Sequence, residues 1–194
     1  MDLLLASTSP IRGTLLANAG VPYGAAAPEV DEAAVKRDFA GEDAELATRL
    51  AELKALSVAK DRADALVIGS DSVLSVDGRR FSKPGGREEA AAHLRFFSGK
   101  TMTLTSAVAL AREERIVWSH SDQARLQVRA LSEDFIERYL DSDWPEVSYC
   151  VGVFRIEGPG IQLFTAIDSD HFTILGMPLL PLLGELRAQG VLTA

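Results

Sequence analysis

The sequence predicts an α/β fold with a mixed, twisted sheet flanked by helices. Short apolar runs that are typical of buried strands alternate along the chain with segments whose apolar residues recur at helical spacing. No internal repeat, low-complexity segment or flexible linker interrupts this alternation. Hydrophobic residues make up 47% of the 194, which is ample for a sizeable core. We therefore expect one domain over residues 1–194, arranged as two lobes around a central cleft.

The elements follow from local signals in chain order. Residues 3–6 are apolar throughout and predict a buried strand, and Ser9-Pro10 has the pattern of a helix cap followed by proline in the first turn. After a strand ending at Asp71, residues 73–76 lead into Asp77-Gly78, a strong hairpin-turn dipeptide, and a return strand reaches Phe81. Further helices are expected from residue 33 and at 43–60, 87–97, 133–140 and 178–189, and further extended segments at 21–27, 101–110, 116–118, 124–128 and 161–167.

Charge and cysteine content exclude several classes of protein. The 28 acidic and 20 basic residues give a net charge of -8, which repels polyanions such as duplex DNA but is compatible with a small anion met by a few cations. Cys150 is the only cysteine, so an intrachain disulfide and a thiolate zinc cage are both excluded. The apolar start lacks a basic leader, and no apolar stretch approaches the roughly 20 residues of a membrane helix. We expect a cytoplasmic protein that binds neither nucleic acid nor a membrane.

Asp71 is the most informative residue of the chain. It follows the apolar run from Leu66 to Ser70, and the carboxyl end of a buried strand is the usual place of an active site in an open α/β sheet. Glu32 lies in an acidic loop, where a solvated role is the simpler interpretation. If both carboxylates reach one cleft, they can hold Mg²⁺, which prefers one or two carboxylates together with substrate phosphates and waters.

Two further segments carry cations suited to phosphate. The loop from Ser7 to Arg12 precedes a helix start, whose free N–H groups bind anions, although simple capping by Ser9 explains the same pattern. This loop is not a P-loop, because no Gly-Lys-Ser/Thr follows. Lys54 falls on the apolar face of its helix, where it either meets phosphates or extends its charge to water from the edge of that face.

Motifs along nearly the whole chain resemble the Maf nucleoside triphosphate pyrophosphatases. In order, they are Leu4-Leu5-Ala6-Ser7-Thr8-Ser9-Pro10 with Arg12, Val30-Asp31-Glu32, Lys54-Ala55, Val67-Ile68-Gly69-Ser70-Asp71, Lys83-Pro84, Ser98-Gly99-Lys100-Thr101 and Ile174-Leu175-Gly176-Met177-Pro178-Leu179. No single motif is specific, but their order and spacing together are.

The resemblance implies a fold like that of inosine triphosphate pyrophosphatases, and hydrolysis between the α and β phosphates with Mg²⁺ or Mn²⁺. It implies that Asp71 accepts a proton from water and that Glu32 helps Asp71 to hold the metal. The triphosphate would be held by Ser7, Ser9, Arg12, Lys54 and Lys83. The implied partner is a small nucleoside triphosphate, and a homodimer is a possible assembly.

Three positions bear on which base is recognised. Members that act on dTTP and UTP have arginine, threonine and glutamine where this chain has Ile11, Ser72 and Glu157. The segment around Glu157 looks more like the branch that hydrolyses 7-methyl-GTP, although that branch has tryptophan and glutamine at the positions of Ile11 and Ser72. We therefore expect a 7-methyl-GTP or guanine-type substrate, with dTTP/UTP as the alternative. A nucleotide-binding regulator without turnover is the alternative of another class, and a nucleic-acid-binding module is disfavoured by the charge.

Overall fold

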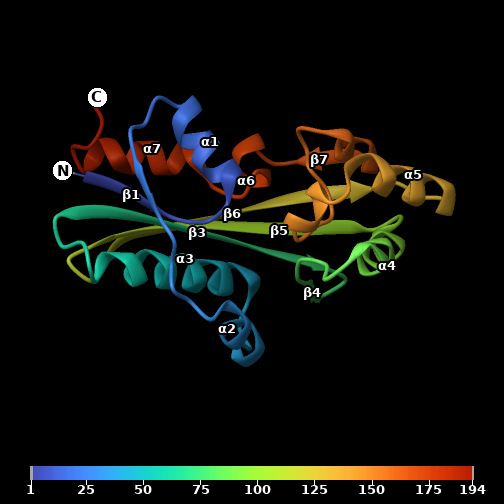
Figure 1. Cartoon of the computed structure of the whole chain (residues 1–194), viewed down its shortest axis with the longest axis horizontal. Helices are drawn as coiled ribbons and strands as arrows, with labels where there is room; N and C mark the ends of the chain where they lie inside the picture. Colours follow the sequence, from blue (N-terminus) through green and yellow to red (C-terminus); the bar gives the residue numbers. More distant parts are fainter. Residues whose placement is uncertain (1, 194) are drawn as a thin grey trace. The chain divides into compact units, whose positions relative to one another are not determined.

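The computed structural model describes residues 2–193, which form a mixed sheet with helices on its faces (Figure 1). The strands are β1 (Asp2–Ala6), β2 (Gly24–Ala26), β3 (Ala65–Val76), β4 (Arg79–Phe81), β5 (Thr101–Arg112), β6 (Arg115–Val128) and β7 (Phe164–Asp168). They pair in the order β2-β1-β3-β5-β6-β7, with β4 on β3 outside this path. Strand β1 is parallel to β2 and β3, whereas β4 and β7 are antiparallel to their neighbours. The predicted α/β fold with a mixed sheet is confirmed.

The helices fall close to their predicted positions. They are α1 (Pro10–Asn18), α2 (Glu32–Asp38), α3 (Asp43–Ala59), α4 (Arg87–Phe97), α5 (Glu133–Asp143), α6 (His171–Ile174) and α7 (Leu179–Ala188), with 3-10 helices at Glu146–Tyr149 and Pro159–Leu163. Local chemistry explains their starts, since Asp31 and Ser132 accept hydrogen bonds from the backbone of α2 and α5. Within residues 2–193, no helix is both long and apolar enough to cross a bilayer.

Two compact units divide the chain. The first comprises the chain up to Ser72, the segment Thr105–Gln123 and the chain from His171, and the second comprises Val73–Leu104 and Ala124–Asp170. Strands β3, β5 and β6 each contribute residues to both units. The single domain over residues 1–194 and its central cleft stay predictions.

Strand alternation builds two cores in the first unit. Leu5 and Ile68 belong to a cluster that includes leucines of α1 and α7, while Leu4 and Val67 pack with Ala55 and other residues of α3. Figure 1 shows α1 and α7 on one face of β1 and β3 and α3 on the other. Consecutive strand residues point to opposite faces of the sheet, and helices cover both faces here. Both faces must therefore be apolar, which explains the continuous apolar runs in β1 and β3.

Gly69 lets α3 approach β3 closely. A Cβ atom at this position would lie 2.0 Å from the carbonyl oxygen of Ala51 and 2.6 Å from the amide nitrogen of Ala55. Only a residue without a side chain fits such a backbone-to-backbone contact. The contact lies between the middle of α3 and the strand segment that leads to Asp71.

The second unit has a hairpin, two helices and an aromatic cluster. Asp77 and Gly78 both have positive φ, and Leu74 to Val76 pair with β4, as the hairpin prediction requires. The ring of Phe81 on β4 contacts His93 and Phe97 of α4 edge to face. These contacts attach α4 to the hairpin.

Several predicted boundaries are wrong. Strand β3 does not end at Asp71 but continues to Val76, because it leaves the parallel pairing with β1 at Gly69 and then pairs with β4. The two short strands expected at 116–118 and 124–128 are one strand, β6, since backbone pairing tolerates its half-exposed polar residues. Residues 159–163 form a 3-10 helix where a strand was expected to begin, and only Gly24–Ala26 of the segment 21–27 is a strand.

Replacing Gly69 with alanine should destabilise the protein by about 1–3 kcal/mol, because the new methyl group collides with the backbone of α3. Chemical denaturation of the variant and the wild type measures the difference. Gly184→Ala is the matched control: its Cβ meets nothing within 4 Å in the middle of α7, so its stability should be unchanged or higher. Equal stability of the two variants would contradict the close approach at Gly69.

Candidate active site

The loop after β1 turns the chain into α1 and directs Arg12 inward. Ser9 occupies the N-cap position, but its side chain makes no capping bond, and its amide instead donates to the Ser7 hydroxyl at 3.1 Å. Pro10 follows in the first turn, where its missing N–H costs nothing. One turn later, Arg12 is only 9% exposed. The prediction that the Ser9 side chain caps the helix is therefore wrong, and the Ser9 amide instead bonds to the Ser7 hydroxyl within the loop.

Two groups hold the Arg12 guanidinium. Its Nε donates to the carbonyl oxygen of Gly176 at 2.9 Å, and its Nη2 donates to the hydroxyl of Ser72 at 3.2 Å. The Ser70 hydroxyl donates to the same Gly176 carbonyl at 2.9 Å. Arginine is permanently charged and presents planar N–H donors, so the arrangement fixes a cation just beyond the end of β1.

Lys54 bridges two carboxylates on the opposite face of β3. Its Nζ lies 2.5 Å from Asp71 Oδ1 and 2.7 Å from Glu32 Oε1. The side chains of Lys54 and Asp71 are 8% and 6% exposed, whereas Glu32 is 39% exposed. Lys54 therefore does not extend its charge to water but is buried against Asp71, and its role toward phosphate stays a prediction. Glu32 takes part in the same cluster and is not merely a solvated loop residue.

The lysines change the titration of Glu32. Burial raises the pKa of Glu32, but hydrogen bonds and positive charge from Lys54 and Lys36 outweigh it and lower that pKa from 4.5 to about 2. Lys36 contributes from one turn along α2, where its Nζ lies 3.1 Å from Glu32 Oε2. Glu32 is consequently ionised at neutral pH.

The Arg12 and Lys54 clusters share one electrostatic field. Burial lowers the pKa of Arg12, and the negative charges of Asp71 and Glu32 act in the opposite direction. Asp71 faces α3, and its neighbour Ser72 faces the opposite side of β3. Lys54 and Arg12, which contact these two residues, nevertheless both interact with the charges of Asp71 and Glu32. The formal charges of the two cations and the two carboxylates sum to zero.

Asp71 Oδ2 is buried and has no hydrogen-bond partner among the described residues. An unpaired buried carboxylate oxygen is costly unless a ligand or water uses it, so the donor set of Asp71 and Glu32 fits a hard divalent cation that completes its shell with waters and phosphates. Over the described part of the chain, no cluster of three or more His, Cys, Asp or Glu could hold a metal by itself. Such a cation would therefore need ligands from its substrate.

Lys83 and Glu157 both belong to the second unit. Lys83 is exposed in the loop after β4, and Glu157 is exposed in the turn before the second 3-10 helix. Burial and the charge of Glu157 raise the pKa of Cys150 to about 11, and Lys83 acts in the opposite direction, so both charges act on this thiol. The roles of Lys83 and Glu157 toward a ligand stay predictions, as does that of the half-buried Ile11.

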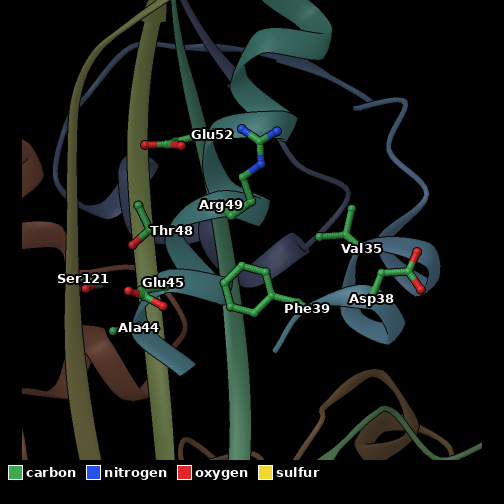
Figure 2. A pocket seen from close by; sticks show the side chains of 9 residues that line it. All are labelled: Val35, Asp38, Phe39, Ala44, Glu45, Thr48, Arg49, Glu52 and Ser121. Atoms are coloured by element: carbon green, nitrogen blue, oxygen red, sulfur yellow. The ribbon is translucent and has the colours of Figure 1, made fainter. Parts of the chain in front are cut away.

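A concave surface of about 800 Å³ in the first unit is lined by none of the residues of the Arg12 and Lys54 clusters (Figure 2). Figure 2 shows side chains of α3 extending toward the strand that carries Ser121, with Phe39 below Arg49. Its ionisable lining residues are Asp38, Glu45, Glu52 and Arg49. The excess of carboxylates repels a polyanion, so this surface does not suit a triphosphate. The cations of the Arg12 and Lys54 clusters suit a triphosphate better.

Sequence reasoning missed several polar residues around Arg12. Ser106, Thr105 and Thr173 are fully buried, and Ser106 contacts both Ser72 and the Thr173 carbonyl at 2.9 Å. The signal was present, since Ser106 directly precedes the apolar run 107–111 of β5, and most buried polar side chains have a specific partner.

Comparisons with known proteins agree with these motifs. The family model described as Maf-like protein matches residues 2–189. A 7-methyl-GTP pyrophosphatase of Rhizobium meliloti (strain 1021) is 45% identical over 195 residues, which cover 99% of this chain and 98% of that protein. A nucleoside triphosphate pyrophosphatase of Nitrobacter winogradskyi is 47% identical over 192 residues, covering 98% and 95%. With a family model spanning nearly its whole length and relatives this similar, the chain belongs to the Maf family.

Proposed function

We propose that this chain hydrolyses nucleoside triphosphates between the α and β phosphates to a nucleoside monophosphate and pyrophosphate. The observation that carries the proposal is the Lys54 ammonium held between Asp71 and Glu32, within the same field as Arg12. Phosphate chemistry needs cations that spread over several oxygens and a carboxylate that orients water, and this cluster supplies both. The names of the relatives support the same reaction.

Asp71 is the proposed proton acceptor for the attacking water. Lys54 occupies Oδ1 and so orients the carboxylate, while Oδ2 is left to accept a proton. Lys54 has three N–H donors, of which two are used by Asp71 and Glu32, and the third suits a phosphate oxygen. Arg12 would bind the phosphates with the donors that Gly176 and Ser72 leave available.

Asp71 and Glu32 are the residues that would hold Mg²⁺ or Mn²⁺. When bound, a divalent cation neutralises charge on the phosphate oxygens. In the structure, Lys54 faces both carboxylates, so its positive charge opposes metal binding there. We propose that the phosphates offer Lys54 an alternative partner, which couples metal binding to nucleotide binding.

A 7-methyl-GTP or guanine-type nucleotide is the proposed substrate. Relatives named 7-methyl-GTP pyrophosphatase support it, as in the Brucella suis protein that is 45% identical over 192 residues. An ionised Glu157 accepts two hydrogen bonds, which matches the adjacent N1–H and N2–H₂ donors of guanine better than the single N3–H of uracil or thymine. A dTTP/UTP preference remains the alternative, and a regulator without turnover remains the alternative of another class.

Pyrophosphate release over a panel of nucleoside triphosphates, with Mg²⁺ or Mn²⁺, tests the proposal. The panel should contain 7-methyl-GTP, GTP, dTTP, UTP and ATP, and the monophosphate product should be identified. Release of pyrophosphate with a preference for 7-methyl-GTP supports both parts of the proposal. A preference for dTTP or UTP would overturn the base assignment alone, and nucleotide binding without any turnover would favour the regulator.

Asp71→Asn should keep the fold and lower turnover about 10²-fold or more, because asparagine cannot accept the proton from water. Steady-state kinetics with the best nucleotide of the panel measures the loss. Asp64→Asn is the control, since Asp64 is an exposed residue at the start of the same strand and should be tolerated. Near-normal turnover of Asp71→Asn would remove this carboxylate from the mechanism.

Lys54→Ala should bind Mn²⁺ about tenfold more tightly than the wild type in the absence of nucleotide, because the competing ammonium is gone. Its turnover should fall for every nucleotide alike. Electron paramagnetic resonance titration of free Mn²⁺ measures the affinity without reference to activity. Lys60→Ala is the matched control, since Lys60 forms an exposed pair with Glu29 and not with these carboxylates. Equal Mn²⁺ affinity of Lys54→Ala and wild type would show that Lys54 does not compete for these carboxylates.

Glu157→Gln should reduce the preference for 7-methyl-GTP over UTP by about tenfold or more, the size expected for loss of a bidentate base contact. The ratio of kcat/KM for the two nucleotides, measured in both proteins, cancels any general loss of activity. An unchanged ratio would assign Glu157 to the solvated surface of its turn.

A further inference from the structure

We propose that Ser106 is a positioning residue that fixes Arg12, through Ser72, for binding the triphosphate. The inference rests on the proposed function and assigns a role to a buried side chain far along the sequence from Arg12. Ser106 touches neither of the proposed catalytic carboxylates. Among the described residues, its hydroxyl bonds to the Ser72 hydroxyl and to the Thr173 carbonyl.

The number of hydroxyl protons determines which group donates and which accepts in each hydrogen bond of this chain. A serine hydroxyl has one proton to donate, and the carbonyl of Thr173 can only accept, so Ser106 donates to Thr173 at 2.9 Å. Ser106 must then accept the proton of Ser72, whose oxygen lies 2.9 Å away. The alternative acceptor for Ser72, the Gly176 carbonyl, is farther, at 3.4 Å. The Ser72 oxygen is thereby oriented to accept from Arg12 Nη2.

The turn from Thr173 to Gly176 anchors both ends of this arrangement. The Gly176 amide donates to the Thr173 carbonyl, and the Gly176 carbonyl accepts from Arg12 Nε. Gly176 has a φ of +94°, and a Cβ there would lie 3.1 Å from the Ser72 hydroxyl and 3.5 Å from Arg12 Nη2. A glycine is therefore needed for the backbone to reach the guanidinium.

The result is a guanidinium held in advance of binding. Gly176 and Ser72 use two of its five N–H donors, and the remaining three have no acceptor within the part of the chain that the structure describes. A donor set that is already oriented loses little entropy when it binds an anion. Removing Ser106 leaves Ser72 free to rotate its proton toward Gly176, which weakens its acceptance from Arg12.

In this role, Ser72 positions Arg12. As one of the three positions that bear on base recognition, Ser72 is instead expected to contact the base. The two roles differ in one measurable way. A change that loosens Arg12 weakens all nucleoside triphosphates equally, because phosphates are common to them. A change in base contact alters their order of preference.

Ser106→Ala should raise KM about tenfold for every nucleotide of the panel, with a smaller change in kcat. Its Kd for a non-hydrolysable α,β-methylene nucleoside triphosphate, measured by calorimetry, should rise by the same factor. In a protein that already carries Arg12→Ala, Ser106→Ala should change the Kd less than about twofold, since the residue through which it acts is absent.

Two further comparisons separate this role from general stability. Ser72→Thr keeps the hydroxyl and should bind more tightly than the equally shaped Ser72→Val, which should behave like Ser106→Ala. Ser142→Ala removes a serine-to-carbonyl bond of similar length on α5 and should leave Kd unchanged. The proposal is overturned if losses from Arg12→Ala and Ser106→Ala add fully, if Ser106→Ala changes only the base preference, or if it has no effect in an active enzyme. A wild type that binds the analogue but releases no pyrophosphate would refute the proposed function and leave the binding comparison intact.

Discussion

The buried contact of Lys54 with Asp71 is the interaction on which the rest of the site depends. Neither charge is tolerable alone at under a tenth exposure, because each would lose its hydration without compensation. The contact requires α3 to lie against β3, which Gly69 permits by the absence of a side chain. A small change in the packing of that helix would therefore alter the charge balance of the site as well as stability.

Strand β3 distributes the chemistry to both of its faces. Asp71 points toward α3 and meets Lys54, while Ser72, one residue later, points to the opposite side and meets Arg12. The parallel partner β1 ends opposite Gly69, so the following residues are not covered by that strand. Two cations from different helices, α1 and α3, thus contact neighbouring residues of a single strand.

The sequence predicted the elements better than the contacts. Turn and cap residues with a single structural meaning, such as Asp77-Gly78 and Ser132, gave the right positions because their chemistry is local. The strand expected to end at Asp71 and the segment 73–76 before the hairpin turn are one strand, because β3 also pairs with β5 and β4, and these partners cannot be seen in β3's own residues. Lys54 and Asp71 were found from helix and strand position, but Ser106 was not, since its partners Ser72 and Thr173 are 34 and 67 residues away. Such pairings exist only in the folded chain.

The central claim is that the Lys54 ammonium is held between two carboxylates and transfers to phosphate when nucleotide arrives. Nuclear magnetic resonance of the Nζ group in protein labelled with ¹⁵N-lysine tests this directly. The account predicts one ammonium resonance that exchanges slowly with water in the free protein, disappears in Lys54→Ala, and shifts when a non-hydrolysable nucleoside triphosphate binds with Mg²⁺. If every lysine ammonium exchanges as fast as an exposed one, or the slow signal ignores the nucleotide, the account is contradicted.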